Sequence, residues 1–143
     1  MTIEEIIRQV ESLGGVLTLR PSPGDGSPEL AWGDLFFYYA PDGALPQGQP
    51  FATIITKDYP DEPSSGLGNG TFRLNIDARG SDRRTGPVGA PTDQDTVIPH
   101  PTYAELGWVS VVRPGERTAD AIGHLLAEAH EHARRRWTRR HAQ

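Results

Sequence analysis

Apolar residues recur with helical spacing at both ends of the chain. At the N-terminus the apolar stripe ends at Gly14 and Gly15, and Thr2 with Glu5 has the pattern of a capping box, so we predict a first helix. A second stripe follows Thr118, which can cap a closing helix with arginines at its C-terminal end. The stripe residues are Ile3, Ile6, Ile7, Val10 and Leu13 in the first helix, and Ile122, Leu125, Leu126, Ala129, Ala133 and Trp137 in the second.

Between the two helices the pattern changes to short β-type runs, which are rich in β-branched and aromatic residues and end near Gly or Pro. The run from Leu30 to Tyr39 is apolar on both faces, which is typical of a central strand, and alternation places Trp32 and Asp34 on the same face. We expect this strand to pair antiparallel with the next one along the chain. The predicted strands cover residues 16–20, 30–39, 51–57, 71–77 and 107–113.

This order of elements predicts an α+β fold with two layers, in which an N-terminal and a C-terminal helix pack on one face of an antiparallel sheet. Residues 60–70 and 78–96 are rich in Gly and Pro, so we expect loops there and at most a short helix in the second segment. A length of 143 residues is typical of one domain. We assign residues 1–137 to a single α+β domain and 138–143 to a basic C-terminal tail.

Composition narrows the classes of function. The absence of cysteine excludes disulfides, thiolate zinc sites and cysteine nucleophiles, and it favours a cytoplasmic location. No window approaches the roughly 20 apolar residues of a membrane span, so we expect no membrane partner. A net charge of −5 and one lysine, Lys57, argue against nucleic acid as a partner, because phosphate binding needs excess Lys and Arg. Nothing in the sequence indicates an oligomeric state.

Four short motifs resemble an uncharacterised domain-of-unknown-function family, which is similar to MmcQ/YjbR-like proteins and to the small domain labelled "luciferase family". Their order and spacing carry the resemblance, which covers residues 1–137. It implies the two-layer α+β fold, a short helix before the His100 segment, and an association with secondary-metabolite genes, but little chemistry. The motifs are Ala31-Trp32-Gly33-Asp34, Thr56-Lys57-Asp58-Tyr59-Pro60, Phe72-Arg73-Leu74-Asn75, and Pro99-His100-Pro101 followed by Gly107-Trp108-Val109.

A candidate ligand-binding cluster consists of residues that lie on or beside predicted strands, near aromatic side chains that could wall a pocket. We expect them to meet near one edge of the sheet. A wider polar set adds Asp58, Arg73 and Asn75. The six residues of the cluster are Trp32, Asp34, Lys57, Tyr59, His100 and Trp108.

Two members of this cluster have both a chemical and a structural interpretation. Lys57 could orient an anion or act as a base, and His100 could move a proton at neutral pH. Alternatively, Lys57 pairs with Asp34 or Asp58 where a strand ends in a turn, and we favour this interpretation over catalysis. His100, between two prolines, could equally be a rigid loop residue that hydrogen-bonds the backbone.

Other polar patterns indicate no cofactor and no metal. His124, Glu128 and His132 lie along one helical line, but this line is opposite the apolar stripe, so we expect these side chains to face water. The glycines of residues 66–70 precede no helix that could bind phosphate. The arginines of residues 134–140 complement the negative end of the helix dipole.

The sequence leaves three functions open. The leading hypothesis is non-catalytic binding or sequestration of a small molecule, because aromatic residues lie on the strands and catalytic signals are scarce. The family resemblance implies a link of this function to secondary metabolism. The first alternative is an enzyme, a hydrolase or transferase that uses Lys57, Asp58 and His100. The second alternative is a protein-interaction module that uses the sheet or the termini. No catalytic residue is assigned.

Overall fold

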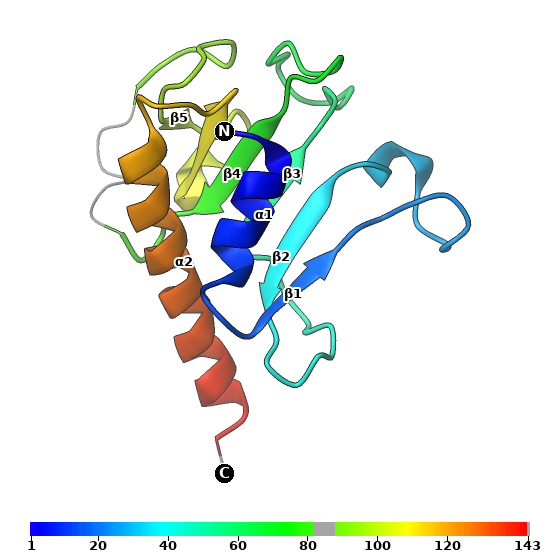
Figure 1. The fold of residues 1–143 in the computed structure, drawn as a ribbon, viewed down its shortest axis with the longest axis vertical. Coiled ribbons are helices and arrows are strands. Elements are labelled where there is room, and N and C mark those ends of the chain that lie inside the picture. The colour runs from blue at the N-terminus through cyan, green and yellow to red at the C-terminus, as the bar shows by residue number, and fades with distance from the viewer. Residues whose placement is uncertain (82–87, 143) are drawn as a thin grey trace.

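The computed structural model describes residues 1–81 and 88–142. These residues form an antiparallel sheet of strand order β1-β2-β3-β4-β6-β5 and two long helices, α1 and α2 (Figure 1). The predicted α+β class is therefore confirmed. The elements are α1 (Ile3–Glu11), β1 (Val16–Leu19), β2 (Leu35–Tyr39), β3 (Ala52–Ile55), β4 (Arg73–Asp77), β5 (Ile98–Pro99), β6 (Trp108–Val112) and α2 (Ala119–Arg140), with short 3-10 helices at Glu29–Ala31 and Ala104–Leu106.

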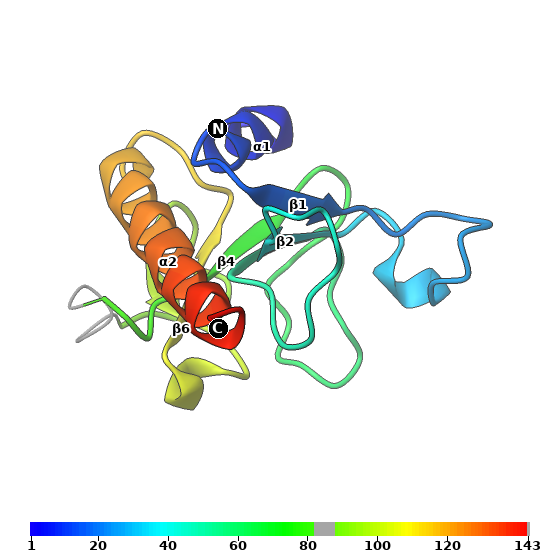
Figure 2. The same cartoon turned by 90° about the horizontal axis from the view of Figure 1, so that it is seen from below.

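Both long helices cover the same face of the sheet, as Figures 1 and 2 show. The apolar stripes of α1 and α2 pack against alternate strand residues, such as Phe37, Ile54 and Leu74, and the three side chains are fully buried. As predicted, β2 and β3 pair antiparallel, with Leu35 opposite Ile54. Neither α1 nor α2 covers the other face of the sheet, which we call the open face.

The two helices begin in different ways. The capping box predicted for α1 is present, because the Thr2 hydroxyl accepts from the Glu5 amide at 3.1 Å and the Glu5 carboxylate accepts from the Thr2 amide at 3.2 Å. The side-chain cap predicted for Thr118 is wrong. Its hydroxyl instead donates to the carboxylate of Asp95 at 2.5 Å, and α2 continues to Arg140, three residues into the predicted tail.

The strand predicted for residues 30–39 is half the predicted length, because it begins at Leu35. Residues 29–31 form a 3-10 helix, and Gly33 then adopts a φ of +88°, which breaks an extended chain. The Trp32 indole donates to the Ser27 carbonyl at 3.3 Å within this loop. Trp32 and Asp34 are therefore not alternate residues of one strand, and the expected common face does not exist.

Strand β4 is buried on both faces. Its apolar residues Leu74 and Ile76 join the core, as their alternation predicts. Its polar residues Arg73 and Asn75 lie on the open face and are 2% and 1% exposed, because loops after β3 and β5 cover them. Strand β5, which pairs with β6, was not predicted.

The segment before β5 bears on a further prediction. Residues 82–87, within the segment where the resemblance implies a short helix, lie outside the described residues. The described residues on either side, 78–81 and 88–96, form turns, bends and irregular chain, with an isolated β-bridge at Gln94.

Candidate functional site

A cavity of about 450 Å³ lies on the open face of the sheet. Strands β2, β3, β4 and β6 contribute to its lining, and the loops of residues 59–62 and 100–106 form walls over them. Polar side chains line the floor, whereas rings and aliphatic groups line the sides. The aromatic residues that line this open-face cavity are Phe36, Tyr38, Tyr59, Tyr103 and Trp108.

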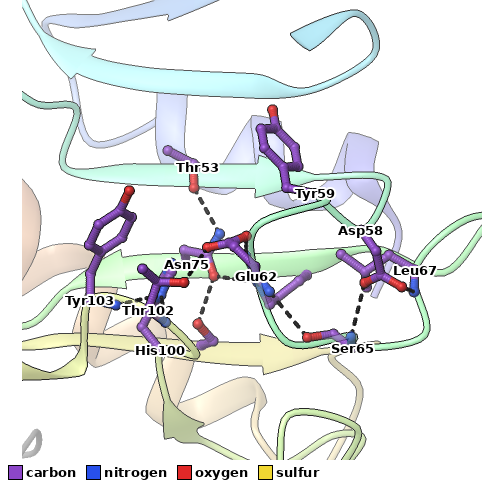
Figure 3. Close-up of polar contacts among 12 residues, drawn as sticks. Thr53, Asp58, Tyr59, Glu62, Ser65, Leu67, Asn75, His100, Thr102 and Tyr103 are labelled. Atoms are coloured by element: carbon purple, nitrogen blue, oxygen red, sulfur yellow. Dashed lines mark hydrogen bonds and ion pairs between the residues drawn. The ribbon is translucent and has the colours of Figure 1, made fainter. Parts of the chain in front are cut away.

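The floor is a hydrogen-bonded network centred on Asn75 (Figure 3). The Asn75 Oδ1 atom accepts from Arg73 Nε at 2.9 Å and from the Ser110 hydroxyl at 2.6 Å. The Asn75 Nδ2 atom donates to the Thr53 hydroxyl at 3.0 Å. Neighbouring strands supply these residues, because Asn75 lies opposite both Thr53 and Ser110 in the sheet register. The network satisfies buried polar groups and holds the floor rigid.

The buried charge of Arg73 is balanced within the cavity wall. Its guanidinium forms an ion pair with Glu62 at 3.2 Å and donates to the Ser65 hydroxyl at 3.1 Å. The second oxygen of Glu62 accepts from the Thr102 hydroxyl at 2.7 Å, which joins the two covering loops. Burial by itself raises the pKa of Glu62, but the Thr102 hydrogen bond and the Arg73 charge outweigh burial and lower it. Glu62 is therefore an anion at neutral pH.

His100 presents a hydrogen-bond donor at the cavity. Its Nδ1 atom accepts from the backbone amides of Thr102 and Tyr103, both at 3.0 Å (Figure 3), so the ring proton is on Nε2. Burial, with a smaller effect of the Arg73 charge, lowers the pKa of His100 from 6.5 to about 4. Among the described residues, the Nε2 atom has no hydrogen-bond acceptor. His100 is therefore a neutral donor at pH 7, and the interpretation as a loop residue that bonds the backbone is confirmed.

Asp34 is the centre of a second polar group, at the N-terminal end of β2. It is fully buried, and its carboxylate accepts from the Thr56 amide at 2.7 Å and from the Tyr59 hydroxyl at 2.6 Å. The Lys57 ammonium lies 3.2 Å from the same carboxylate and donates to the carbonyls of Leu30 and Trp32. Burial, followed by this hydrogen bond to Asp34, raises the pKa of Tyr59. The predicted Lys57–Asp34 pair is confirmed, and it anchors a loop.

The structure divides the predicted cluster into two parts. Asp34 and Lys57, with the carbonyl of Trp32, form the group that anchors the loop before β2. The open-face cavity is lined by Tyr59, His100 and Trp108. Tyr59 connects the two parts, because its ring lines the cavity and its hydroxyl bonds Asp34.

The match to known families covers almost the whole molecule. The model of a family of unknown function, DUF6194, matches residues 1–142. The chain belongs to this family. The predicted resemblance to a domain of unknown function is thereby confirmed, but the match gives DUF6194 no link to MmcQ/YjbR-like or luciferase-family proteins. No curated protein and no solved structure matches the chain.

Clusters of metal-ligating side chains and membrane-spanning helices are absent from the described part of this DUF6194 chain. No three His, Asp or Glu residues in it gather around a potential metal position, and none of its helices could cross a membrane. The expectation that three α2 residues face water holds for His124, which is exposed. It is wrong for Glu128 and His132, which are partly buried, and burial lowers the pKa of His132.

Several cavity residues of the DUF6194 chain were missing from the predicted cluster. Arg73 and Asn75 belonged to the wider polar set, and alternation with Phe72, Leu74 and Ile76 was the signal for their common face. Glu62 and Thr102 carried no signal, because each lies in a loop without periodicity. Asp58, also in the wider set, binds its own loop, since its carboxylate accepts from the Ser65 amide at 2.9 Å (Figure 3).

Proposed function

We propose that this protein binds a small, neutral organic molecule in the open-face cavity without transforming it. The observation that carries this proposal is the Nε2–H group of His100, a donor in the cavity lining that the described residues leave without an acceptor. A ligand carbonyl or ether oxygen would accept from this donor, and such a neutral hydrogen bond contributes about 1 kcal/mol. The proposed ligand therefore carries an acceptor that faces His100.

The size and lining of the cavity support this ligand class. A volume of about 450 Å³ is in the range of small-molecule sites, and such sites combine apolar walls with a few fixed polar groups. Here rings such as Trp108 and Tyr103 supply the walls, and the Asn75 network supplies the fixed floor. A flat molecule with one or two rings fits this combination.

The charges favour a neutral ligand over an ion. Arg73 is paired with Glu62, and His100 is uncharged at pH 7 because burial lowers its pKa to about 4. An anion would have to lose its hydration without meeting an unpaired positive charge among the described lining residues, which costs free energy. Asp61, a lining carboxylate that bonds no described residue, is exposed to solvent.

The hydrogen bonds that the candidate catalytic side chains already make within the protein favour binding over catalysis. The proposed hydrolase or transferase would use Lys57, Asp58 and His100 as free groups. Lys57 instead bonds two carbonyls and Asp34, and Asp58 bonds the amides of its loop. The Nδ1 lone pair of His100 already accepts two amides, so His100 has no lone pair to act as a general base.

The test is a binding screen with a variant that removes the donor and keeps the loop. In His100→Asn, the Asn oxygen can accept from the Thr102 and Tyr103 amides in place of Nδ1, but the Nε2–H group is lost. Neutral aromatic compounds with a carbonyl or ether oxygen are screened by ligand-observed NMR, and the affinities of the hits are measured by calorimetry. We expect His100→Asn to weaken binding about five-fold, since a neutral hydrogen bond contributes about 1 kcal/mol.

Two results contradict the proposal. One is a parent protein that binds none of the compounds, and the other is equal affinity in the parent and in His100→Asn. His124→Asn, on the exposed surface of α2, is the matched control and should bind as the parent does. Conversion of a hit during prolonged NMR incubation would instead establish an enzyme.

Two finer parts of the proposal rest on the sequence. A secondary metabolite as the natural ligand follows from the resemblance described above, and the ring-lined cavity is compatible with such a molecule. A cytoplasmic location follows from the cysteine-free composition. Cell fractionation of the source organism tests the location, and mass spectrometry of small molecules that co-purify with the protein tests the ligand.

A further inference from the structure

A second and larger cavity lies beside the C-terminal end of α2. It has a volume of about 620 Å³, and the loop that joins β2 to β3 forms its opposite wall. Arg140 connects the two walls, because its Nη1 atom donates to the Gln47 carbonyl at 2.8 Å. Tyr39 and Trp137 pack edge to face at its base, with 5.9 Å between ring centroids. We call this space the α2 cavity.

Positive charge exceeds negative charge in the lining of the α2 cavity. Arg136 and Arg140 line it, and Asp42 is the acidic residue among the described residues that do so. The Asp42 carboxylate accepts from the Ala44 amide at 3.1 Å, within its own loop. This surplus contrasts with the net charge of −5 of the whole chain.

Arg136 differs from its neighbours on α2 because it has no acceptor. Arg134 and Arg135 both bond the carboxylate of Glu131, at 2.6 to 3.1 Å. Arg136 has no hydrogen bond or ion pair with any described residue, and its Nε atom is enclosed without a partner. The side chain as a whole is only partly buried and lines the α2 cavity, so its guanidinium is available to an acceptor from outside the protein.

The electrostatic surroundings of Arg136 point the same way. Burial lowers the pKa of Arg136, and the positive charges of Arg79, Arg139 and Arg140 lower it further, against the opposing effect of Asp77. These guanidinium groups leave a cationic surplus around the side chain. An anion in the cavity would reduce this repulsion.

We propose that the α2 cavity is a second binding site, which takes the oxyanion group of a small organic molecule through Arg136 and Arg140. The planar guanidinium matches the geometry of carboxylate and phosphate oxygens, and charge-assisted hydrogen bonds to them are among the stronger ones in proteins. The volume of about 620 Å³ leaves room for more than a bare ion. This site is separate from the neutral ligand proposed for the open-face cavity and does not depend on it.

The experiment measures the binding of two organic probes and two control compounds by calorimetry. Phenyl phosphate and benzoate carry the two oxyanion types, inorganic phosphate lacks the organic part, and phenol lacks the charge. We expect phenyl phosphate or benzoate to bind the parent, inorganic phosphate to bind more weakly, and phenol not to bind. Binding should weaken when the salt concentration rises, because salt screens charges at the protein surface.

Matched variants on α2 locate the site. Arg136→Gln removes the charge and keeps a hydrogen-bonding side chain of similar length, and it should weaken the probe that binds by about ten-fold or more. Arg140→Gln should also weaken binding. Arg135→Gln is the control, because Arg135 is exposed, bonds Glu131 and does not line the cavity. The affinity of this variant for the probe should equal that of the parent. Melting temperatures verify that each variant is folded.

Three results would overturn the proposal. The first is no binding of either organic probe to the parent at about 5 mM, which would correspond to a very weak site. The second is an equal loss in Arg135→Gln and Arg136→Gln, which would indicate diffuse attraction to a basic helix end. The third is equal affinity for phenol and phenyl phosphate. His100→Asn should leave probe binding unchanged, so failure at one cavity is distinguishable from failure at the other.

Discussion

At the scale of single residues, a few buried carboxylates and one imidazole organise the loops around the open-face cavity. Asp34 holds the Thr56 amide, the Tyr59 hydroxyl and the Lys57 ammonium at once. Its removal leaves each of these donors without this acceptor. The Lys57 ammonium is engaged in the same group, because it lies beside Asp34 and donates to two backbone carbonyls. It is therefore not free to serve as a base.

We predict that Asp34→Ala lowers the free energy of unfolding by about 3 kcal/mol, because it strips several buried donors of their acceptor. Urea unfolding followed by tryptophan fluorescence measures the effect. Asp61→Ala is the control, because Asp61 is exposed and bonds no described residue, and its effect should stay within about 0.5 kcal/mol. Equal stability of the two variants would contradict the role of Asp34.

The protonation of His100 should make stability depend on pH. The pKa of His100 is about 4 in the folded protein, because burial and the Arg73 charge outweigh the effect of Glu62, whereas 6.5 is the ordinary value. Between these two values the unfolded chain binds more protons than the folded one, so the free energy of unfolding falls as the pH falls. The His100 contribution lost from pH 7 to pH 5 should be about 2 kcal/mol.

The measurement compares urea unfolding of the parent and of His100→Asn at both pH values. The variant should lose about 2 kcal/mol less than the parent on acidification, because it lacks the group that titrates. His124→Asn should behave as the parent does. An identical pH dependence in His100→Asn and the parent would show that the buried imidazole is not the group responsible.

At the scale of elements, the carboxylate of a residue in a distant loop accepts hydrogen bonds from the start of α2. Asp95 accepts from the amides of Gly115, Arg117 and Thr118 and from the Thr118 hydroxyl. Burial by itself would raise the pKa of Asp95, but these hydrogen bonds outweigh it and lower the pKa. A residue outside the helix thus replaces the local cap that the sequence predicted at Thr118.

We predict that Asp95→Ala lowers the free energy of unfolding by about 2 kcal/mol, because donors at the start of α2 lose their acceptor. Thermal and urea unfolding measure the loss. Glu116→Ala removes the same charge from the turn that Asp95 bonds, and Glu116 is exposed, so this control should remain close to the parent. If Glu116→Ala lowered the free energy of unfolding as much as Asp95→Ala, the effect would come from the lost charge and not from the hydrogen bonds of Asp95.

At the scale of the whole molecule, one core joins the two helices to the sheet, and the open-face cavity lies on the opposite side of the sheet from that core. Leu125 of α2 is 1% exposed within this core, so Leu125→Ala should cost about 2–5 kcal/mol of stability. Leu45→Ala, at an exposed loop position, should cost little and serves as the control in the same urea unfolding assay. A loss for Leu125→Ala under about 1 kcal/mol would contradict the packing of α2.

The sequence by itself determined the elements whose burial repeats along the chain. The stripe of α1, the stripe of α2 and the alternation in β4 predict the α+β fold, because local periodicity reports which side of an element faces the core. The predicted strand over residues 30–39 was too long because it also rested on local periodicity alone. Periodicity does not register the turn at Gly33 or the bonds that Asp34 makes to residues 22 to 25 positions away.

Only the tertiary structure decided which polar residues are buried and where the cavities lie. Thr102 and Glu62 are 40 positions apart, and their hydrogen bond joins the walls of the open-face cavity. Arg73, read from the sequence alone, could be an exposed residue of a half-buried strand, yet loops from elsewhere in the chain enclose it. Such contacts depend on how distant loops meet over the sheet, and no local pattern of apolar and polar residues encodes that meeting.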